Sequence, residues 1–131
     1  MVMGHTQLHR VSESCSTSVT TEQLYEAGAK IMTLQRANTV RGMTKADGTY
    51  GNNNLRADHD VITEWVFEKD PDIEPFTAGT DKMEREDFQN ALTMVYKEFG
   101  WDEKTGAPTA DSLDNYNLTD VKEDLQSKGL L

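Results

Sequence analysis

The sequence is poor in several residue types, and each shortage excludes a class of protein. It contains 1 cysteine among 131 residues, so no disulfide can form within the chain, which agrees with a reducing compartment. Basic residues are few: 13 Lys and Arg face 23 Asp and Glu, which gives a formal net charge of -10. Because nucleic acids and anionic membranes bind basic surfaces, we expect neither as a partner.

Long apolar runs are also missing. No stretch approaches the roughly 20 apolar residues of a membrane-spanning helix, and the N-terminus has no apolar core of a secretory signal. These two absences predict a cytoplasmic protein. The 36% of hydrophobic residues and 8% of aromatic residues over this length predict one modest folded core.

The chain divides into a short polar segment and a longer patterned one. Residues 1–18 are rich in Ser, Thr and His and have no sustained period, which predicts a flexible N-terminal tail or the edge of a fragment. Residues 19–131 carry apolar residues at helical spacing and no alternating strand pattern. We therefore expect one all-α domain, a small helical bundle of three longer and two short helices with long polar loops.

The first long helix is predicted from its cap. Thr20 and Gln23 have the spacing of a capping box, and Gly42 suits the left-handed residue that ends a helix. Arg36 and Arg41 suit the negative C-terminal end of the helix dipole. Apolar residues between these ends recur every three or four positions and predict one buried face: Leu24, Ala27, Ile31, Leu34 and Ala37.

Two more long helices are expected after a loop rich in Gly and Asn. Asp58 is a candidate N-cap for a helix over residues 59–68, which Pro71 forces to end. Asp81 and Glu84 form a D-x-x-E capping arrangement for the next helix, and Gly100 stands at its end. The apolar positions of this third helix are Phe88, Ala91, Leu92, Val95 and Phe99.

Two short helices complete the expected fold. Pro108 precedes Thr109, which we expect to cap a helix near Leu113. Thr119 is the predicted cap of the last helix, which ends at Gly129.

The candidate chemical groups do not form a recognised catalytic or metal motif. Cys15 has no C-x-x-C partner, so an inert thiol is expected. His5 and His9 have i, i+4 spacing but lack the Glu of H-E-x-x-H and a third ligand, so we expect exposed histidines. The loops with Asp, Asn and Gly do not have EF-hand spacing, and no phosphate-binding glycine motif occurs.

Two other groups could serve a site but have simpler explanations. Asp58, His59 and Asp60 form an acid and base cluster in sequence, yet adjacent helical positions point in different directions, so a helix start is the expected role. Aromatic residues near apolar stripes usually pack in a core rather than against a ligand, and this applies to Trp65, Phe67, Phe76 and Trp101. The sequence therefore assigns no catalytic, cofactor-binding or metal-binding residue.

The chain carries GAKIMTLQRANTVRGMTKADGT at residues 28–49, and GWD and TGAPT within residues 79–118. These two blocks resemble the C-terminal part of the aldehyde ferredoxin oxidoreductase family, in the manner of one bacterial branch. The first block is similar to the family pattern G-x-[RK]-[IL]-x-x-L-x-R-x-x-N-x-R, which a D-x-T loop follows. Residues 79–118 carry an acidic helix, a Tyr, GWD and TGAPT in the family's order, and residues 59–76 lie between the blocks. With VKEDLQSKGLL, the resemblance covers residues 28–131. The residues themselves, without the resemblance, make Gly100 and Gly106 expected sites of unusual φ and Trp101 a core anchor after the helix end.

The resemblance implies the fold and the parent activity. Members bind a tungsten or molybdenum bis-pterin and a [4Fe-4S] cluster, oxidise aldehydes or related substrates, and pass electrons to ferredoxin or a partner subunit. The family's cluster cysteines and catalytic Glu and His have no counterpart here. SESC lacks the Asp and Gly of the family's D-x-x-G-[LI]-C segment, so we do not assign Cys15 as a ligand.

Three hypotheses follow from the sequence. The first is a C-terminal helical domain of such an enzyme, which packs over the cofactor domain, forms part of the cavity wall and is inactive alone. The second is a small acidic interaction module on the same scaffold, which should show only scattered apolar residues on its surface, whereas a domain from a larger enzyme should expose an apolar patch. The third is an independent enzyme that uses the region of Asp58 to Asp60.

Overall fold

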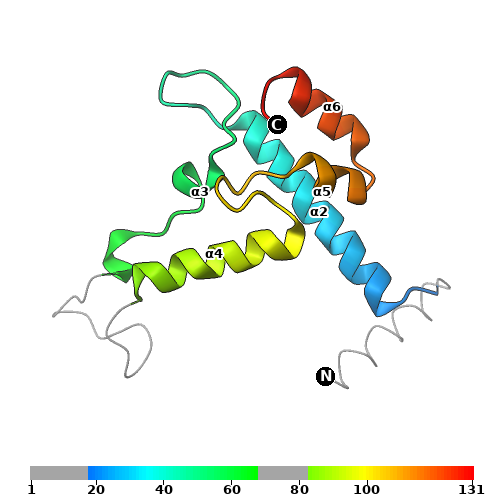
Figure 1. The fold of residues 1–131 in the computed structure, drawn as a ribbon, viewed down its shortest axis with the longest axis horizontal. Helices are drawn as coiled ribbons and strands as arrows, with labels where there is room; N and C mark the ends of the chain where they lie inside the picture. Colours follow the sequence, from blue (N-terminus) through cyan, green and yellow to red (C-terminus); the bar gives the residue numbers. More distant parts are fainter. Residues whose placement is uncertain (1–17, 68–82) are drawn as a thin grey trace.

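The computed structural model describes residues 18–67 and 83–131, and in these residues the fold is all-α, as predicted. Figure 1 shows a long helix crossing the molecule, a second helix at an open angle to it, and shorter helices packed against its C-terminal half. The described residues contain no strand, only isolated bridges between Thr44 and Tyr50 and between Trp101 and Pro108. The helical elements are α2 (Thr21–Gly42), α3 (Leu55–Asp58), the 3-10 turn η1 (Glu64–Val66), α4 (Arg85–Phe99), α5 (Ala110–Asn115) and α6 (Thr119–Ser127).

The capping box predicted for α2 is confirmed. The Thr20 side chain accepts from the Gln23 backbone N–H at 3.1 Å, and the Gln23 side chain accepts from the Thr20 backbone N–H at 2.9 Å. Each contact satisfies a donor that the first turn of a helix leaves unpaired. The prediction for the other end is wrong, because Gly42 is still helical and the extended residue Met43 follows it.

The predicted buried face of α2 is wrong in most positions. Leu24, Ala27 and Ile31 are exposed, while Leu34 is half-buried. Only Ala37 of the predicted set is buried. The face that packs against the rest of the domain is made of smaller residues: Ala29, Thr33, Ala37 and Val40. Small side chains let neighbouring loops approach the helix backbone closely.

The predicted helix over residues 59–68 does not form. Asp58 is instead the last residue of α3, which ends because the backbone N–H groups of His59 and Asp60 both donate to the Leu55 carbonyl, at 2.9 and 2.8 Å. The β-branched run at 61–63 has low helix propensity, and only the single turn η1 follows it. Pro71 lies outside the described residues.

The helix α4 begins later than predicted and ends as predicted. Its N-cap is Glu84, whose side chain makes no capping hydrogen bond, and Asp81 lies outside the described residues. Gly100 ends it in the left-handed region at φ 71°. Its one fully buried side chain is Tyr96, which the apolar pattern omitted, whereas Val95 of that pattern is exposed.

The short helices α5 and α6 close the apolar core. Thr109 caps α5 as predicted, but Thr119 is already helical and Leu118 is the N-cap of α6. Gly129 lies beyond the helix in the left-handed region. Both helices bury leucines against the C-terminal half of α2, and this core contains Ala37, Val40, Leu55, Ala107, Leu113, Leu118, Leu125 and Leu130.

The cap of α5 should matter more to stability than the cap of α2. The Thr109 hydroxyl accepts from the Ser112 backbone N–H at 3.1 Å and donates to the Gly100 carbonyl at 2.8 Å, so it joins two elements. Thr109→Ala is expected to lower the free energy of unfolding by about 2 kcal/mol in urea titrations followed by circular dichroism. Thr20→Ala is the matched control, at about 0.5 kcal/mol, because the first turns of α2 are exposed and can fray locally. Equal losses for the two variants would contradict this.

Candidate functional site

Arg36 lies at the centre of the one buried ion pair that the described residues contain. It projects from the packed side of α2, between Thr33 and Val40. Its Nη1 donates to Asp60 Oδ1 at 2.8 Å, its Nη2 pairs with Asp60 Oδ2, and its Nε donates to the Gly106 carbonyl at 2.7 Å. The two charged side chains are 12% and 11% exposed. A bidentate pair of this kind fixes the relative positions of three chain segments.

The carboxylate of Asp60 is fully used by its neighbours. The Tyr96 hydroxyl donates to Oδ2, and His59 Nδ1 lies 2.9 Å from Oδ1. With the two contacts from Arg36, both oxygens are occupied. A general base needs a free lone pair directed at a substrate proton, and this carboxylate does not present one. The cluster of Arg36, His59, Asp60 and Tyr96 therefore holds the fold together.

Two arginines and three aromatic rings contact one another next to this cluster. The guanidinium of Arg36 lies 5.4 Å from the ring centre of Tyr96 and 4.8 Å from that of Trp101. The guanidinium of Arg56 also lies 5.4 Å from the ring centre of Tyr96. Phe99 stacks on Trp101 with ring centres 4.8 Å apart. Cation–π contacts of partly desolvated arginines add to the stability of the packed rings. We call this set of five side chains the arginine–aromatic stack.

Arg56 ties α4 to the loop that follows it. Its side chain donates to the Gln89 carbonyl at 2.7 Å, to Thr93 Oγ1 at 3.0 Å and to the Glu103 carbonyl at 2.6 Å. Its backbone N–H donates to the Thr105 carbonyl at 2.8 Å. All of these acceptors belong to this chain, so Arg56 is engaged in holding the fold.

The loop of residues 101–108 brings its backbone against Arg36. Asp102 organises it, because its Oδ1 accepts from the backbone N–H groups of Lys104 and Thr105 at 3.0 and 2.8 Å. Those backbone contacts, that of Thr105 above all, lower the pKa of Asp102. Gly106 adopts φ 72°, as the sequence predicted, and a Cβ there would lie 2.7 Å from Arg36 Nη2.

The environment moves the pKa values of both acids in the cluster. Burial works to raise the pKa of Asp60, but the hydrogen bonds from Arg36, Tyr96 and His59 outweigh it and lower that pKa to about 2. Burial, reinforced by the hydrogen bond to the Asp60 carboxylate, raises the pKa of Tyr96 to about 12. Both shifts favour the charged carboxylate beside the neutral phenol.

The lowered pKa of Asp60 predicts a loss of stability in acid. A group whose pKa is lower in the folded state stabilises the fold above its ordinary pKa of 3.8, and this contribution disappears as the pH falls toward 2. The contribution at pH 7 is about 2 kcal/mol. We expect urea titrations between pH 5 and pH 2 to show this loss in the wild type. In Asp60→Asn, the free energy of unfolding should fall by about 2 kcal/mol less than in the wild type over this pH range. An equal fall in the two proteins would contradict the assignment to Asp60.

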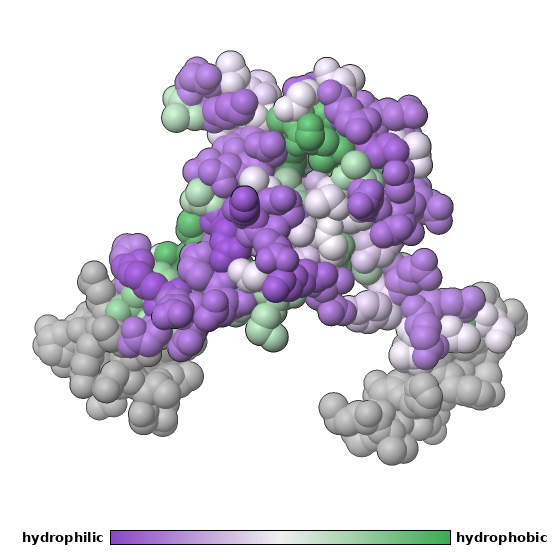
Figure 2. Space-filling view, viewed as in Figure 1, coloured by the Kyte–Doolittle hydropathy of each residue, from purple (hydrophilic) through white to green (hydrophobic). Residues whose placement is uncertain are grey.

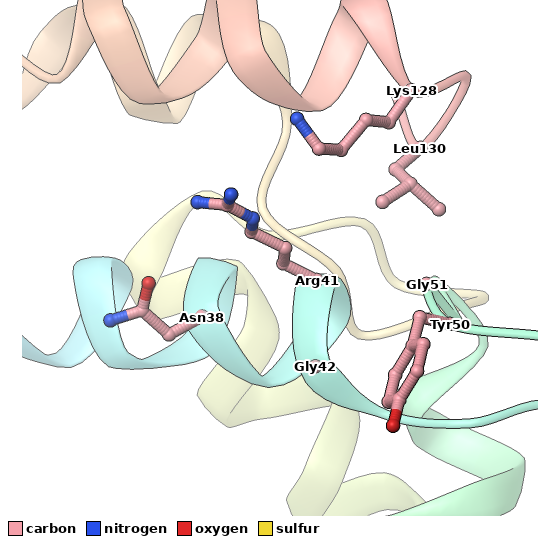
Figure 3. Close-up of a pocket in the computed structure, with 7 residues that line it drawn as sticks. All are labelled: Asn38, Arg41, Gly42, Tyr50, Gly51, Lys128 and Leu130. Carbon is pink, nitrogen blue, oxygen red and sulfur yellow. The ribbon is translucent and has the colours of Figure 1, made fainter.

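An open groove lies at the other end of α2, between this helix, the loop at Tyr50 and Gly51, and the residues that follow α6. Its volume is about 600 Å³, and Figure 3 shows the side chains of Arg41 and Lys128 directed toward each other across it. Both cations pair with Asp124, Arg41 at 3.6 Å. Figure 2 shows apolar side chains in this region, between the loop after α2 and α6. Because α2 and α6 both end here, the positive charges of Arg41 and Lys128 interact favourably with the negative C-terminal ends of the two helix dipoles. The groove is lined by Asn38, Arg41, Gly42, Tyr50, Gly51, Lys128 and Leu130.

The structure brings together part of what the sequence singled out. His59 and Asp60 do meet, whereas Asp58 accepts from Asn52 Nδ2 at 2.7 Å instead. Their expected role as helix-start residues is wrong, because no helix starts there. Phe67 and Trp101 are buried, as expected of core residues. The candidates Cys15, His5, His9 and Phe76 lie outside the described residues, as does the side chain of Trp65.

The partners of Asp60 were not predicted from the sequence. Arg36 was assigned to the helix dipole, and Tyr96 was left out of the apolar face of α4. A signal for Arg36 exists in the sequence, because the buried residues Thr33 and Val40 lie three positions before it and four positions after it, on one helix face. A charged residue on a face of small residues indicates a buried partner.

Among the described residues, no group of three or more His, Cys, Asp or Glu side chains could hold a metal ion. Nor is any described helix long and apolar enough to cross a membrane. The fold and the buried cluster define a small all-α domain whose charged centre is directed inward.

The particular family follows from comparison with known proteins. Residues 7–118 match the family model of aldehyde ferredoxin oxidoreductase, domains 2 and 3. The chain belongs to this family and represents a C-terminal part of an aldehyde ferredoxin oxidoreductase-like enzyme. No solved structure matches it.

Proposed function

We propose that this chain serves as the C-terminal helical domain of an oxidoreductase that oxidises an aldehyde or a related substrate. The parent enzyme would belong to the bacterial branch of the family, work in the cytoplasm and pass electrons to ferredoxin or to an electron-transfer subunit. The domain would pack over the cofactor domain, form part of the substrate cavity wall and be inactive alone. The match over residues 7–118 is the observation that carries this proposal.

The residues of this chain do not fit the metal centres that the family implies. A [4Fe-4S] cluster is held by several cysteine thiolates, and the sequence contains 1 cysteine. The two arginines of the arginine–aromatic stack, Arg36 and Arg56, are engaged by acceptors of this chain, and Arg41 at the groove pairs with Asp124. We therefore assign the tungsten or molybdenum pterin and the cluster to the remaining domains of the parent enzyme.

The alternative is an acidic interaction module that works without a parent enzyme. The distribution of exposed apolar residues favours the parent enzyme. Leu24, Tyr25, Ile31 and Met32 are exposed together on one helix, while the other exposed large apolar residues are spread over the loops, α4 and the last residue. The net charge of -10 gives no support to a nucleic acid or an anionic membrane as partner in either case.

The proposal is tested by metal content and activity of the 131-residue chain. We expect the chain grown with iron, tungstate and molybdate to carry far less than one metal ion per molecule by elemental analysis. It should not reduce a viologen dye with aldehydes, and adding the remaining domains should restore that activity. Stoichiometric metal in the chain alone would contradict the proposal. His59→Ala checks the hypothesis of an independent enzyme, because any activity of the chain alone that this substitution abolishes would support it.

A further inference from the structure

One face of α2 carries no charged residue over its first four turns. Its members recur at spacings of three and four, so they line one side of the helix, and Glu22, Glu26 and Lys30 lie on its other sides. We call it the uncharged face of α2. It consists of Thr21, Leu24, Tyr25, Gly28, Ile31, Met32 and Gln35.

The rest of the described chain leaves this face uncovered. Residues 21–28 are all exposed, and Figure 1 shows the first turns of α2 projecting beyond the other helices. Ile31 is 57% exposed and Tyr25 is 58% exposed, although the Tyr25 hydroxyl donates to Glu98 of α4 at 2.5 Å. A helix gains most of its stability from packing its apolar side, so an uncovered apolar side indicates packing against another chain segment.

Gly28 lies in the middle of this face, and the fold gives no reason for a glycine there. Its backbone is helical rather than left-handed. Among the described residues, nothing lies within 4 Å of a Cβ built at Gly28, apart from the helix's own backbone. A glycine inside an exposed helix costs stability relative to alanine. A missing side chain is useful where a second helix crosses closely, because the two backbones can then approach.

We propose that the uncharged face of α2 is a helix-packing surface and that a helix of the remaining domains of the parent oxidoreductase crosses it at Gly28. This inference rests on the proposed function. The occupant presents an apolar face without charges, because a charge set against Leu24 or Ile31 would be desolvated without a partner. The matched family model describes domains 2 and 3, so the family's proteins include a further domain that this match does not cover.

The test measures folding and docking in the same variants. Gly28→Ala should stabilise the isolated chain, raising Tm by about 3 °C, because alanine is the better helix former. It should weaken binding to the separately expressed remainder of the parent enzyme about tenfold, measured by calorimetry, because a Cβ blocks the close crossing. Glu26→Ala is the control in the same helix: it introduces an alanine at an exposed position outside the uncharged face and should leave binding unchanged.

A second pair of variants tests the face without relying on glycine. Ile31→Lys places a charge on the uncharged face at an exposed position, so it should fold normally and lose binding by about tenfold or more. Lys30→Ala changes the neighbouring residue outside the face and should bind like the wild type.

The outcomes separate this inference from the proposed function. If the wild type binds the remainder of the parent enzyme and Gly28→Ala and Ile31→Lys bind it equally well, the uncharged face of α2 is not the packing surface. The proposed function would then still stand. A wild-type chain that does not bind the remainder of the parent enzyme would overturn both. A dimer of this chain in sedimentation equilibrium that Gly28→Ala abolishes, without any effect on binding to the remainder, would show a second copy to be the occupant and overturn the inference.

Discussion

Gly106→Ala is expected to destabilise the domain by about 4 kcal/mol, measured by urea unfolding. Two costs add up at this position. An alanine at φ 72° carries backbone strain of about 1–2 kcal/mol. Its Cβ would also lie 2.7 Å from Arg36 Nη2 and 2.8 Å from the Tyr96 hydroxyl, so the buried pair of Arg36 and Asp60 must open.

Gly48→Ala separates the two costs. Gly48 has a similar φ of 83°, and no described residue outside its immediate chain neighbours lies within 4 Å of a Cβ built there. It should show the backbone strain alone, about 1 kcal/mol. Equal losses at Gly48 and Gly106 would mean that the close approach to Arg36 contributes nothing.

Arg36→Met is expected to destabilise the domain by about 3 kcal/mol at pH 7, because it leaves the Asp60 carboxylate buried without its cation. The loss should be smaller at pH 3. Without Arg36 the pKa of Asp60 rises, so acid protonates the carboxyl group and removes the unpaired charge. Urea titrations at the two pH values measure both effects.

A double-mutant cycle isolates the pair. In the Asp60→Asn background, Arg36→Met should cost at least about 1 kcal/mol less than in the wild type, because no buried charge is left behind. Arg41→Met is the surface control, with a side chain 58% exposed and Asp124 at 3.6 Å, and should cost less than about 0.5 kcal/mol. Additive losses for Arg36 and Asp60 would contradict a coupled ion pair.

The buried cluster has a direct bearing on the function. Arg36, Asp60 and Tyr96 are a basic, an acidic and a phenolic group in contact, which in an open cleft would be candidates for catalysis. Here their hydrogen bonds are made with one another and with Gly106, so their chemistry stabilises the fold. Within the described part of the chain, the uncharged face of α2 and the open groove by Arg41 are two surfaces that remain accessible to other molecules.

Local signals in the sequence were sufficient for much of the fold. The capping box of Thr20 and Gln23, the cap at Thr109 and the left-handed Gly100 were all predicted and are all present. Each depends on residues within a few positions of one another, so neighbouring sequence contains the whole cause. The helix predicted after Asp58 does not form, because the β-branched run at 61–63 has low helix propensity and because Arg36 and Tyr96, far away in the chain, hold Asp60. No local pattern represents the second of these causes.

The sequence by itself determined that this chain is helical, where most of its helices begin or end, and that one cysteine cannot hold an iron–sulfur cluster. Only the tertiary structure decided which side of α2 is buried and what Arg36 binds. Its partners Asp60 and Gly106 are 24 and 70 positions away, and their contact exists only after the helices pack. A periodic pattern shows that a helix has an apolar side, whereas the neighbours available to it decide whether that side is covered within the domain or remains for another one.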